Sequence, residues 1–153
     1  MERLVRTSAK ALVIKDECML AIKLHDIEGD FYIMPGGGQT SGELLPATVQ
    51  REVAEETGIS VKAKDALFII EGAEGEKYHR VDVIYLCDYI GESNMKYHPD
   101  KNQVGYEWLE IVTLNKAPLY PSKLRRAIMN YYEGKETPVY LGNENVGDPE
   151  ITD

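Results

Sequence analysis

The chain has 153 residues, which suits one globular domain and is too short for two ordinary ones. With 43% hydrophobic and 28% charged residues it has an ordinary globular composition, which excludes collagen-like, disordered and membrane-spanning proteins. The 17 basic and 26 acidic residues give a net charge of −9, which argues against duplex nucleic acid or a membrane surface as partner but is compatible with binding a cation.

The pattern of apolar residues predicts a mixed α/β or α+β domain. Alternating, β-branched and aromatic runs predict strands, which in chain order are residues 8–14, 18–24, 30–34, 61–70, 79–90, 106–112 and 137–141. Four-residue apolar spacing predicts helices at 43–57 and 122–134, the second with Arg125 and Arg126 facing outward. Loops are expected at 71–76 and 91–104.

One domain is therefore expected over residues 1–141. Residues 142–153 contain four carboxylates and no basic residue, so we expect an acidic C-terminal tail.

The first predicted helix carries an unusual group of carboxylates. Glu52, Glu55 and Glu56 follow i, i+3 and i+4 spacing, so at about 100° per residue they share one face. Glu56 projects inside the apolar stripe that contains Val49 and Val53, where a carboxylate is unfavourable unless it is paired, protonated or bound to metal. Grouped carboxylate oxygens suit Mg²⁺, which usually also binds phosphate oxygens of a substrate.

Three glycines form a turn just before this helix. A turn without side chains can bring its backbone close to a phosphate or offer a carbonyl oxygen to a metal. We expect Gly36 to contribute to the metal site, and Gly37 and Gly38 to contact the substrate.

The segment from this turn through the helix resembles the Nudix box, G-x5-E-x7-R-E-U-x-E-E-x-G-U with U aliphatic, at every defined position. The matching residues are Gly37, Glu43, Arg51, Glu52, Val53, Glu55, Glu56, Gly58 and Ile59. The order of elements on either side is also similar to the Nudix fold, an α/β/α sandwich around a mixed β-sheet.

This resemblance implies hydrolysis of a diphosphate bond in a nucleoside diphosphate derivative, such as ADP-ribose, a nucleotide sugar or a dNTP, by water attack at phosphorus. It implies that Glu52, Glu55 and Glu56 bind Mg²⁺ or Mn²⁺, with Glu52, Glu55 and Arg51 as the catalytic residues. A metal held by these glutamates would neutralise charge on the phosphate oxygens. Glu43 is expected to be a structural partner, for example of Arg51.

The general base stays open between a glutamate of the box and the segment before Trp108. Related sequences often have an acid in that segment, whereas this chain has Asn102 and Gln103, with Asp100 and Glu107 as the nearby candidates. The departure also leaves a rival interpretation, a non-catalytic nucleotide-binding or regulatory module on the same fold.

The remaining expectations concern compartment and assembly. Cys18 and Cys87 lack the spacing of a zinc site or a disulfide framework, so two buried free thiols are expected. The N-terminal residues lack the apolar segment of a signal peptide, which favours the cytoplasm. The expected partner is a small nucleotide, and a homodimer could form through the strand predicted at 137–141.

Overall fold

The computed structural model describes residues 4–74, 77–94 and 102–144 of the chain. Its elements are β1 (Leu4–Lys15), β2 (Cys18–Asp26), β3 (Gly29–Ile33), β4 (Gly36–Gly38), α1 (Leu45–Thr57), β5 (Ile59–Gly72), β6 (Tyr78–Glu92), β7 (Gln103–Glu110), the 3₁₀ helix η1 (Ile111–Lys116), α2 (Lys123–Tyr132) and β8 (Tyr140–Asn143). Among the described residues, no helix has the length and apolar character needed to cross a membrane.

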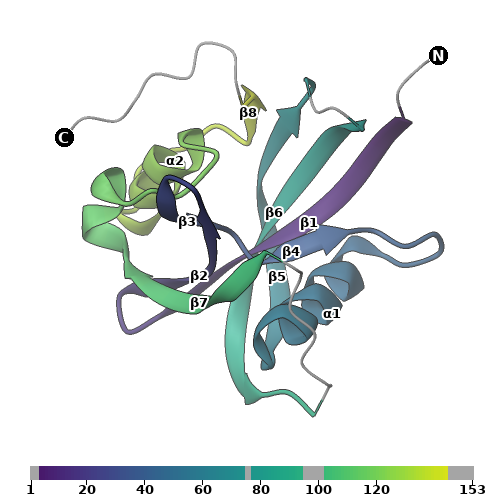
Figure 1. Ribbon diagram of the computed structural model, residues 1–153, viewed down its shortest axis with the longest axis horizontal. Coiled ribbons are helices and arrows are strands. Elements are labelled where there is room, and N and C mark those ends of the chain that lie inside the picture. The colour runs from purple at the N-terminus through teal and green to yellow at the C-terminus, as the bar shows by residue number, and fades with distance from the viewer. Residues whose placement is uncertain (1–3, 75–76, 95–101, 145–153) are drawn as a thin grey trace.

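Strand β1 is the centre of one mixed sheet (Figure 1). The strand order is β3-β2-β1-β6-β5-β8, with β4 paired to β1 and β7 paired to β2. β1 runs parallel to β6, from Leu4 beside Tyr78 to Val13 beside Cys87, and β5 runs parallel to β8. The other strand pairs are antiparallel.

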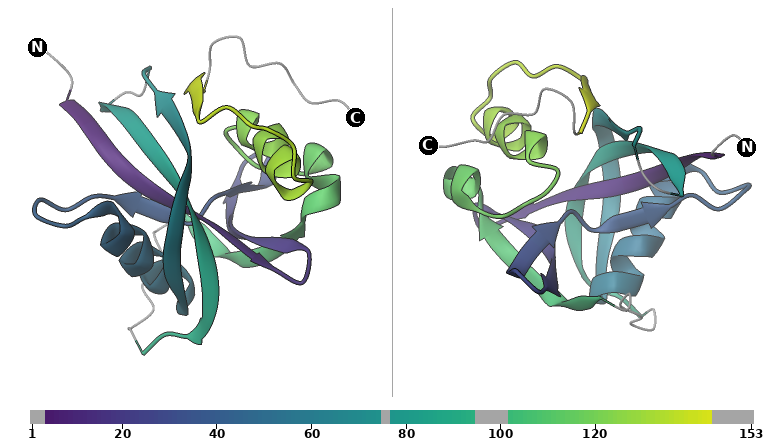
Figure 2. Two further views of the ribbon diagram at one scale, coloured as in Figure 1. Left: turned by 180° about the vertical axis from the view of Figure 1, so that it is seen from behind. Right: turned by 45° about the horizontal axis from the view of Figure 1, so that its top comes forward.

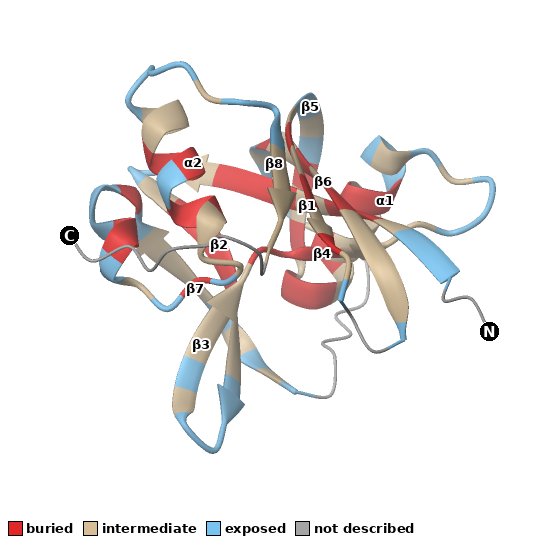
Figure 3. Cartoon of the chain, turned by 90° about the horizontal axis from the view of Figure 1, so that it is seen from above, coloured by how far each residue is buried: buried red, intermediate tan, exposed pale blue. Residues whose placement is uncertain are grey.

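The two long helices lie on opposite sides of the central strands (Figure 2). Successive side chains of β1 point to opposite faces, so Ala11 and Val13 join the core that contains Val49 of α1, while Leu12 joins the core that contains Ile128 of α2. Buried residues gather where these strands meet the helices (Figure 3). The structure therefore confirms the α/β/α sandwich around a mixed sheet.

All seven predicted strands and both predicted helices are present, but several boundaries were wrong. The strand expected at 106–112 is β7, which begins at Gln103 and ends at Glu110. The strand expected at 137–141 is β8, which includes Gly142 and Asn143 and therefore extends past the expected domain boundary. Residues 145–153, which make up most of the expected tail, lie outside the described residues.

Two elements were not predicted, β4 and η1. In η1 the apolar residues Ile111 and Leu114 are three apart and both are buried, which is the spacing of a 3₁₀ turn rather than of a strand. β4 consists of three glycines, whose pairing with β1 has no apolar pattern to reveal it.

Two side-chain predictions also need correction. Arg125 does not face outward: only 8% of it is exposed, its Nε donates to the Leu119 carbonyl at 2.8 Å, and its guanidinium stacks on Tyr120. Both cysteines are free, but only Cys87 is buried, and burial raises the pKa of its thiol to about 12. Cys18 is half-buried because it begins β2 directly after a turn.

Strand β4 approaches β1 so closely that its first residue has to be glycine. Gly36 has φ of +142°, and a Cβ at that position would lie 2.1 Å from the carbonyl oxygen of Ala9 and 2.7 Å from Cα of Lys10. Both atoms belong to the backbone of the central strand and cannot move aside cheaply.

We expect Gly36→Ala to destabilise the fold by at least about 2 kcal/mol more than Gly42→Ala, because only the first substitution adds a steric clash. Gly42 is the matched control: it also has a positive φ, +85°, but its added Cβ would meet nothing within 4 Å. Urea denaturation of the two variants measures the difference. Equal losses of stability would contradict the argument, whereas an unfolded Gly36→Ala chain beside a folded Gly42→Ala chain would support it.

Candidate functional site

Three carboxylates lie together in the C-terminal half of α1, which packs against the glycine turn. We call Glu52, Glu55 and Glu56 the acidic cluster. Helix α1 ends at Thr57, and Gly58 caps it in the left-handed conformation by donating its N–H to the Ala54 carbonyl. The helical register therefore brings the cluster to one place, as the sequence predicted.

Arg51 connects this cluster to the start of the helix. Its Nε and Nη2 donate to the two carboxylate oxygens of Glu43 at 2.8 and 3.0 Å, a bidentate pair. Its Nη1 donates to Glu52 at 3.0 Å and to Glu55 at 3.3 Å, and its Nη2 also reaches the Gly38 carbonyl at 3.2 Å. One guanidinium thus holds three carboxylates and the turn in fixed positions.

The Arg51–Glu43 pair perturbs both groups. Hydrogen bonds from Arg51 and then from Thr48 lower the pKa of Glu43 to about 2. The bonds to Glu43 also raise the pKa of Arg51 further above its ordinary value. These contacts confirm the expectation that Glu43 is a structural partner of Arg51.

Glu56 is the buried member of the acidic cluster, with 4% of its surface exposed. One carboxylate oxygen accepts the Gly36 N–H at 2.7 Å, and the other accepts the side-chain amide of Gln103 at 3.0 Å. Burial raises the pKa of Glu56 to about 7, although the Gly36 N–H and the charge of Lys10 oppose the shift. The predicted position inside the apolar stripe is confirmed.

Side chains pack on both sides of the glycine turn. A Cβ at Gly37 would lie 2.5 Å from the carboxyl carbon of Glu52, and one at Gly38 would lie 2.4 Å from the guanidinium of Arg6. Lys10 lies against Gly36 in the same way, with its Cδ 2.9 Å from where a Cβ would be. The bare turn therefore separates carboxylates from two cations, Arg6 and Lys10, neither of which the sequence alone predicts to be part of the site.

The residues expected to hold a metal are adjacent, but they do not form a ready-made metal site. Within the described ranges, no three His, Cys, Asp or Glu side chains converge tightly enough for one. The reason is that Glu52 and Glu55 turn to Arg51, while Glu56 turns to Gly36.

The donor chemistry of this region nevertheless suits a hard divalent cation. The side chains that could bind a metal here all offer oxygen atoms. The four carboxyl groups of Glu43 and the acidic cluster outnumber the single guanidinium of Arg51. Gly36 contacts the cluster through its N–H, so the use of its carbonyl as a ligand stays a prediction.

The candidates for the base lie in different places. Glu107 accepts hydrogen bonds from Lys23 at 2.9 Å and from Tyr32 at 2.8 Å, which hold it in a separate polar group on β2, β3 and β7. Gln103 of β7 reaches the acidic cluster, where its side-chain amide donates to Glu56. Asp100 lies outside the described residues.

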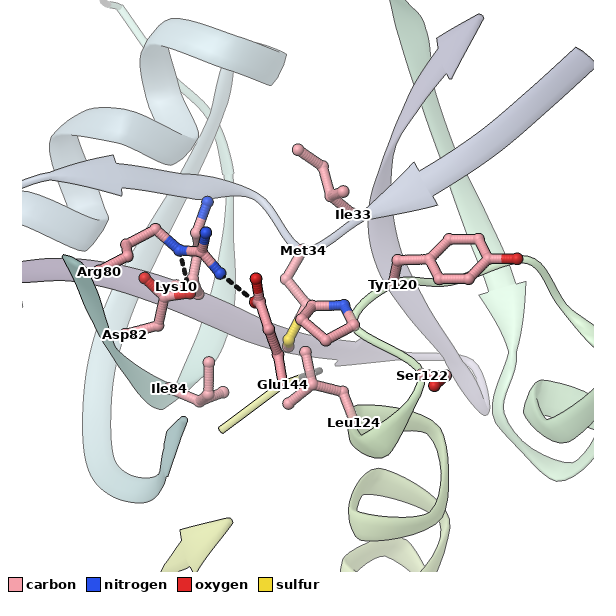
Figure 4. Close-up of a pocket in the computed structure, with 11 residues that line it drawn as sticks. Lys10, Ile33, Met34, Arg80, Asp82, Ile84, Tyr120, Ser122, Leu124 and Glu144 are labelled. Atoms are coloured by element: carbon pink, nitrogen blue, oxygen red, sulfur yellow. Dashed lines mark hydrogen bonds and ion pairs between the residues drawn. The ribbon is translucent and has the colours of Figure 1, made fainter. Parts of the chain in front are cut away.

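A cavity of about 550 Å³ opens on the face of the sheet that carries α2 (Figure 4). Its apolar lining includes Ile33, Met34, Tyr120 and Leu124. Its charged lining residues are Lys10, Arg80, Asp82 and Glu144. Lys10 links the cavity to the acidic cluster, since it also lies against Gly36 and its charge acts on Glu56. The volume is typical of a small-molecule site.

This cavity could not be predicted from the sequence, because its residues come from distant parts of the chain. One local feature of the sequence does point to the cavity, namely the alternation of polar and apolar residues along β1. Arg6, Ser8 and Lys10 fall on one face of this strand, opposite Ala9 and Ala11. The pairing of β1 with β6, which brings Ser8 beside Asp82, has no such signal.

Comparison with known proteins agrees with this architecture. A family model described as the NUDIX domain matches residues 4–130. An ADP-ribose pyrophosphatase of Methanocaldococcus jannaschii is 27% identical over 126 residues, which cover 80% of this chain and 72% of that protein.

Solved structures show the same fold at low sequence identity. A NUDIX hydrolase from Nitrosomonas europaea has a TM-score of 0.70 at 18% identity, with 88% of this chain and 93% of that chain covered. A MutT protein from Methanosarcina mazei Go1 has a TM-score of 0.69 at 20% identity, with 89% and 99% covered.

We expect Glu43→Gln to lower the free energy of unfolding by about 1–2 kcal/mol at pH 7, because it removes the charge that pairs with Arg51. The pKa of Glu43 is about 2 in the folded chain and ordinarily 4.5, so its charge stabilises the fold fully above pH 4.5, and this stabilisation is lost as the pH falls from there towards 2. The difference between wild type and variant should therefore shrink at pH 3.

Urea denaturation at pH 7 and pH 3 measures that difference. Glu136→Gln, the same substitution at an exposed position, serves as the control. A difference of the same size at both pH values would contradict the assignment of the pair.

Proposed function

This chain belongs to the NUDIX family of hydrolases, and on that premise we propose that it cleaves the diphosphate bond of a nucleoside diphosphate derivative by water attack at phosphorus. The observation that carries the proposal is the acidic cluster beside a bare glycine turn, with Arg51 holding Glu52 and Glu55 and the Gly36 N–H holding Glu56. Such an arrangement supplies what the reaction needs, namely oxygen donors for a cation and a backbone that a phosphate can approach.

We assign a divalent metal, Mg²⁺ or Mn²⁺, to Glu52, Glu55 and Glu56. When bound, it would neutralise the charge that develops on the phosphate oxygens and lower the pKa of a coordinated water. Arg51 orients Glu52 and Glu55 by hydrogen bonds, and the Gly36 N–H orients Glu56. These contacts support the assignment because they keep three carboxyl groups adjacent in the free protein.

The substrate would extend from the glycine turn into the cavity. Lys10 stands where the two meet and offers an ammonium group to phosphate oxygens. The apolar side formed by Ile33, Met34 and Tyr120 suits the flat base of a nucleoside. ADP-ribose is the first compound to test, because a relative is named for it, followed by nucleotide sugars and dNTPs.

The base in this proposal is a glutamate of the box or Asp100. Gln103 has no carboxylate to accept a proton, and Glu107 is engaged with Lys23 and Tyr32. A box glutamate acting as base would combine metal binding and proton transfer in one cluster.

The expected compartment and assembly stay proposals. We retain a cytoplasmic location and a homodimer, in which a partner would pair with the outer edge of β8. That strand ends the sheet and pairs only with β5 among the described strands. Light scattering of the purified chain tests the dimer against the mass of one 17.2 kDa chain.

We expect Glu55→Gln to lower metal-dependent turnover at least about 100-fold while leaving the fold intact, because Glu55 is a partly exposed ligand whose amide replacement has the same size. Glu136→Gln, exposed and distant in sequence from the cluster, should keep wild-type turnover. Unchanged turnover of folded Glu55→Gln would overturn the assignment of the acidic cluster.

A product-resolved assay checks this with ADP-ribose, a nucleotide sugar and a dNTP, each with Mg²⁺ and with Mn²⁺. Nucleotide binding without release of a mononucleotide or phosphate from any compound would instead support a non-catalytic nucleotide-binding module.

A further inference from the structure

Four polar side chains form a continuous chain at the charged end of the cavity. Ser8 donates its hydroxyl to Asp82 at 2.9 Å, Arg80 donates Nε to the other oxygen of Asp82 at 2.8 Å, and an Nη of Arg80 donates to Glu144. Asp82 is only 3% exposed. Figure 4 shows Arg80 between the two acids, joined to each by a dashed line.

Glu144 is held in this position by the backbone that precedes it. Its N–H donates to the Glu71 carbonyl at 2.8 Å, and Lys123 Nζ donates to the carbonyls of Leu141 at 3.3 Å and Asn143 at 2.7 Å. Strand β8 itself pairs with β5. The carboxylate therefore reaches Arg80 from a fixed segment that lies 64 positions away in the sequence.

Glu144 brings a second negative charge to Arg80, in addition to that of Asp82. Asp82 alone, with its second oxygen satisfied by Ser8, balances the guanidinium. Burial by itself would lower the pKa of Arg80, but Asp82 and Glu144 together raise it above the ordinary value. With both acids present, the charged residues that line the cavity are two cations, Lys10 and Arg80, and two anions.

This balance decides which groups the end of the cavity can bind. An arginine that faces a site without an acid binds phosphate, whereas a carboxylate at the same place accepts hydrogen bonds from ribose hydroxyls and repels phosphate; the same alternative separates the two forms of nicotinamide dinucleotide in other folds. Here Glu144 forms an ion pair with Arg80. The end of the cavity is therefore built for a hydroxyl-bearing, uncharged group.

We propose that Glu144 is a specificity-determining residue, which restricts the cavity to nucleosides with free ribose hydroxyls and excludes those that carry an additional phosphate on the ribose. The proposal rests on the placement of the nucleoside in the cavity under the proposed function. It assigns the discrimination to the contact between Glu144 and Arg80, outside the acidic cluster.

The test is binding rather than hydrolysis, so it does not depend on turnover. Isothermal titration calorimetry with Mg²⁺ compares AMP with adenosine 2′,5′-bisphosphate, which differs from AMP by one ribose phosphate. The wild-type chain should bind AMP more tightly. In Glu144→Gln the ratio of the two dissociation constants should shift at least about tenfold towards the bisphosphate, because the isosteric amide removes the charge that covers Arg80.

Glu133→Gln is the matched control, since it removes the same charge from an exposed residue at the opposite end of α2 from the cavity and should keep the wild-type ratio. If Glu144 has only a structural role, Glu144→Gln would bind both nucleotides more weakly and the ratio of their dissociation constants would not change. That result would overturn the proposal. So would a wild-type chain that binds neither nucleotide. Hydrolysis in the substrate panel together with an unchanged ratio would refute the role of Glu144 alone and leave the proposed function standing.

Discussion

The buried carboxylate of Glu56 joins the parts of the molecule on which the site depends. It comes from α1, accepts the backbone N–H of β4 at Gly36 and accepts the amide of Gln103 on β7. β4 in turn pairs with β1, the strand that carries Lys10 into the cavity. A desolvated acid is costly, and its hydrogen bonds offset that cost only if helix, turn and strand keep their relative positions.

The part of the site that could be predicted from sequence is the part that local periodicity determines. Helical spacing alone places Glu56 inside the apolar stripe with Val49 and Val53. Glu43 precedes the helix, and its pairing with Arg51 was implied only by the resemblance to the Nudix box. The box motif added the expected roles of these residues. The two helices follow from the same kind of pattern, whereas the α/β/α layering was implied by the resemblance to the Nudix fold.

The rest depends on pairing between distant segments, which has no local signal. Ser8 meets Asp82 because of the parallel register of β1 and β6, and Glu144 meets Arg80 because β8 pairs with β5. The boundary of β8 could not be predicted because backbone pairing, rather than apolar side chains, extends it to Asn143. Gln103 illustrates the same limit, because only the fold shows that its amide reaches Glu56.

The alternation of side chains along β1 has an evolutionary consequence. One set of alternate residues packs under α1, and the other set, which includes Ser8 and Lys10, serves the cavity and its polar chain. Because a shift of one position exchanges the two faces of a strand, an insertion or deletion here would bury Lys10 and expose its alanine neighbours at once. We therefore expect β1 to change during evolution by substitution and to keep its length.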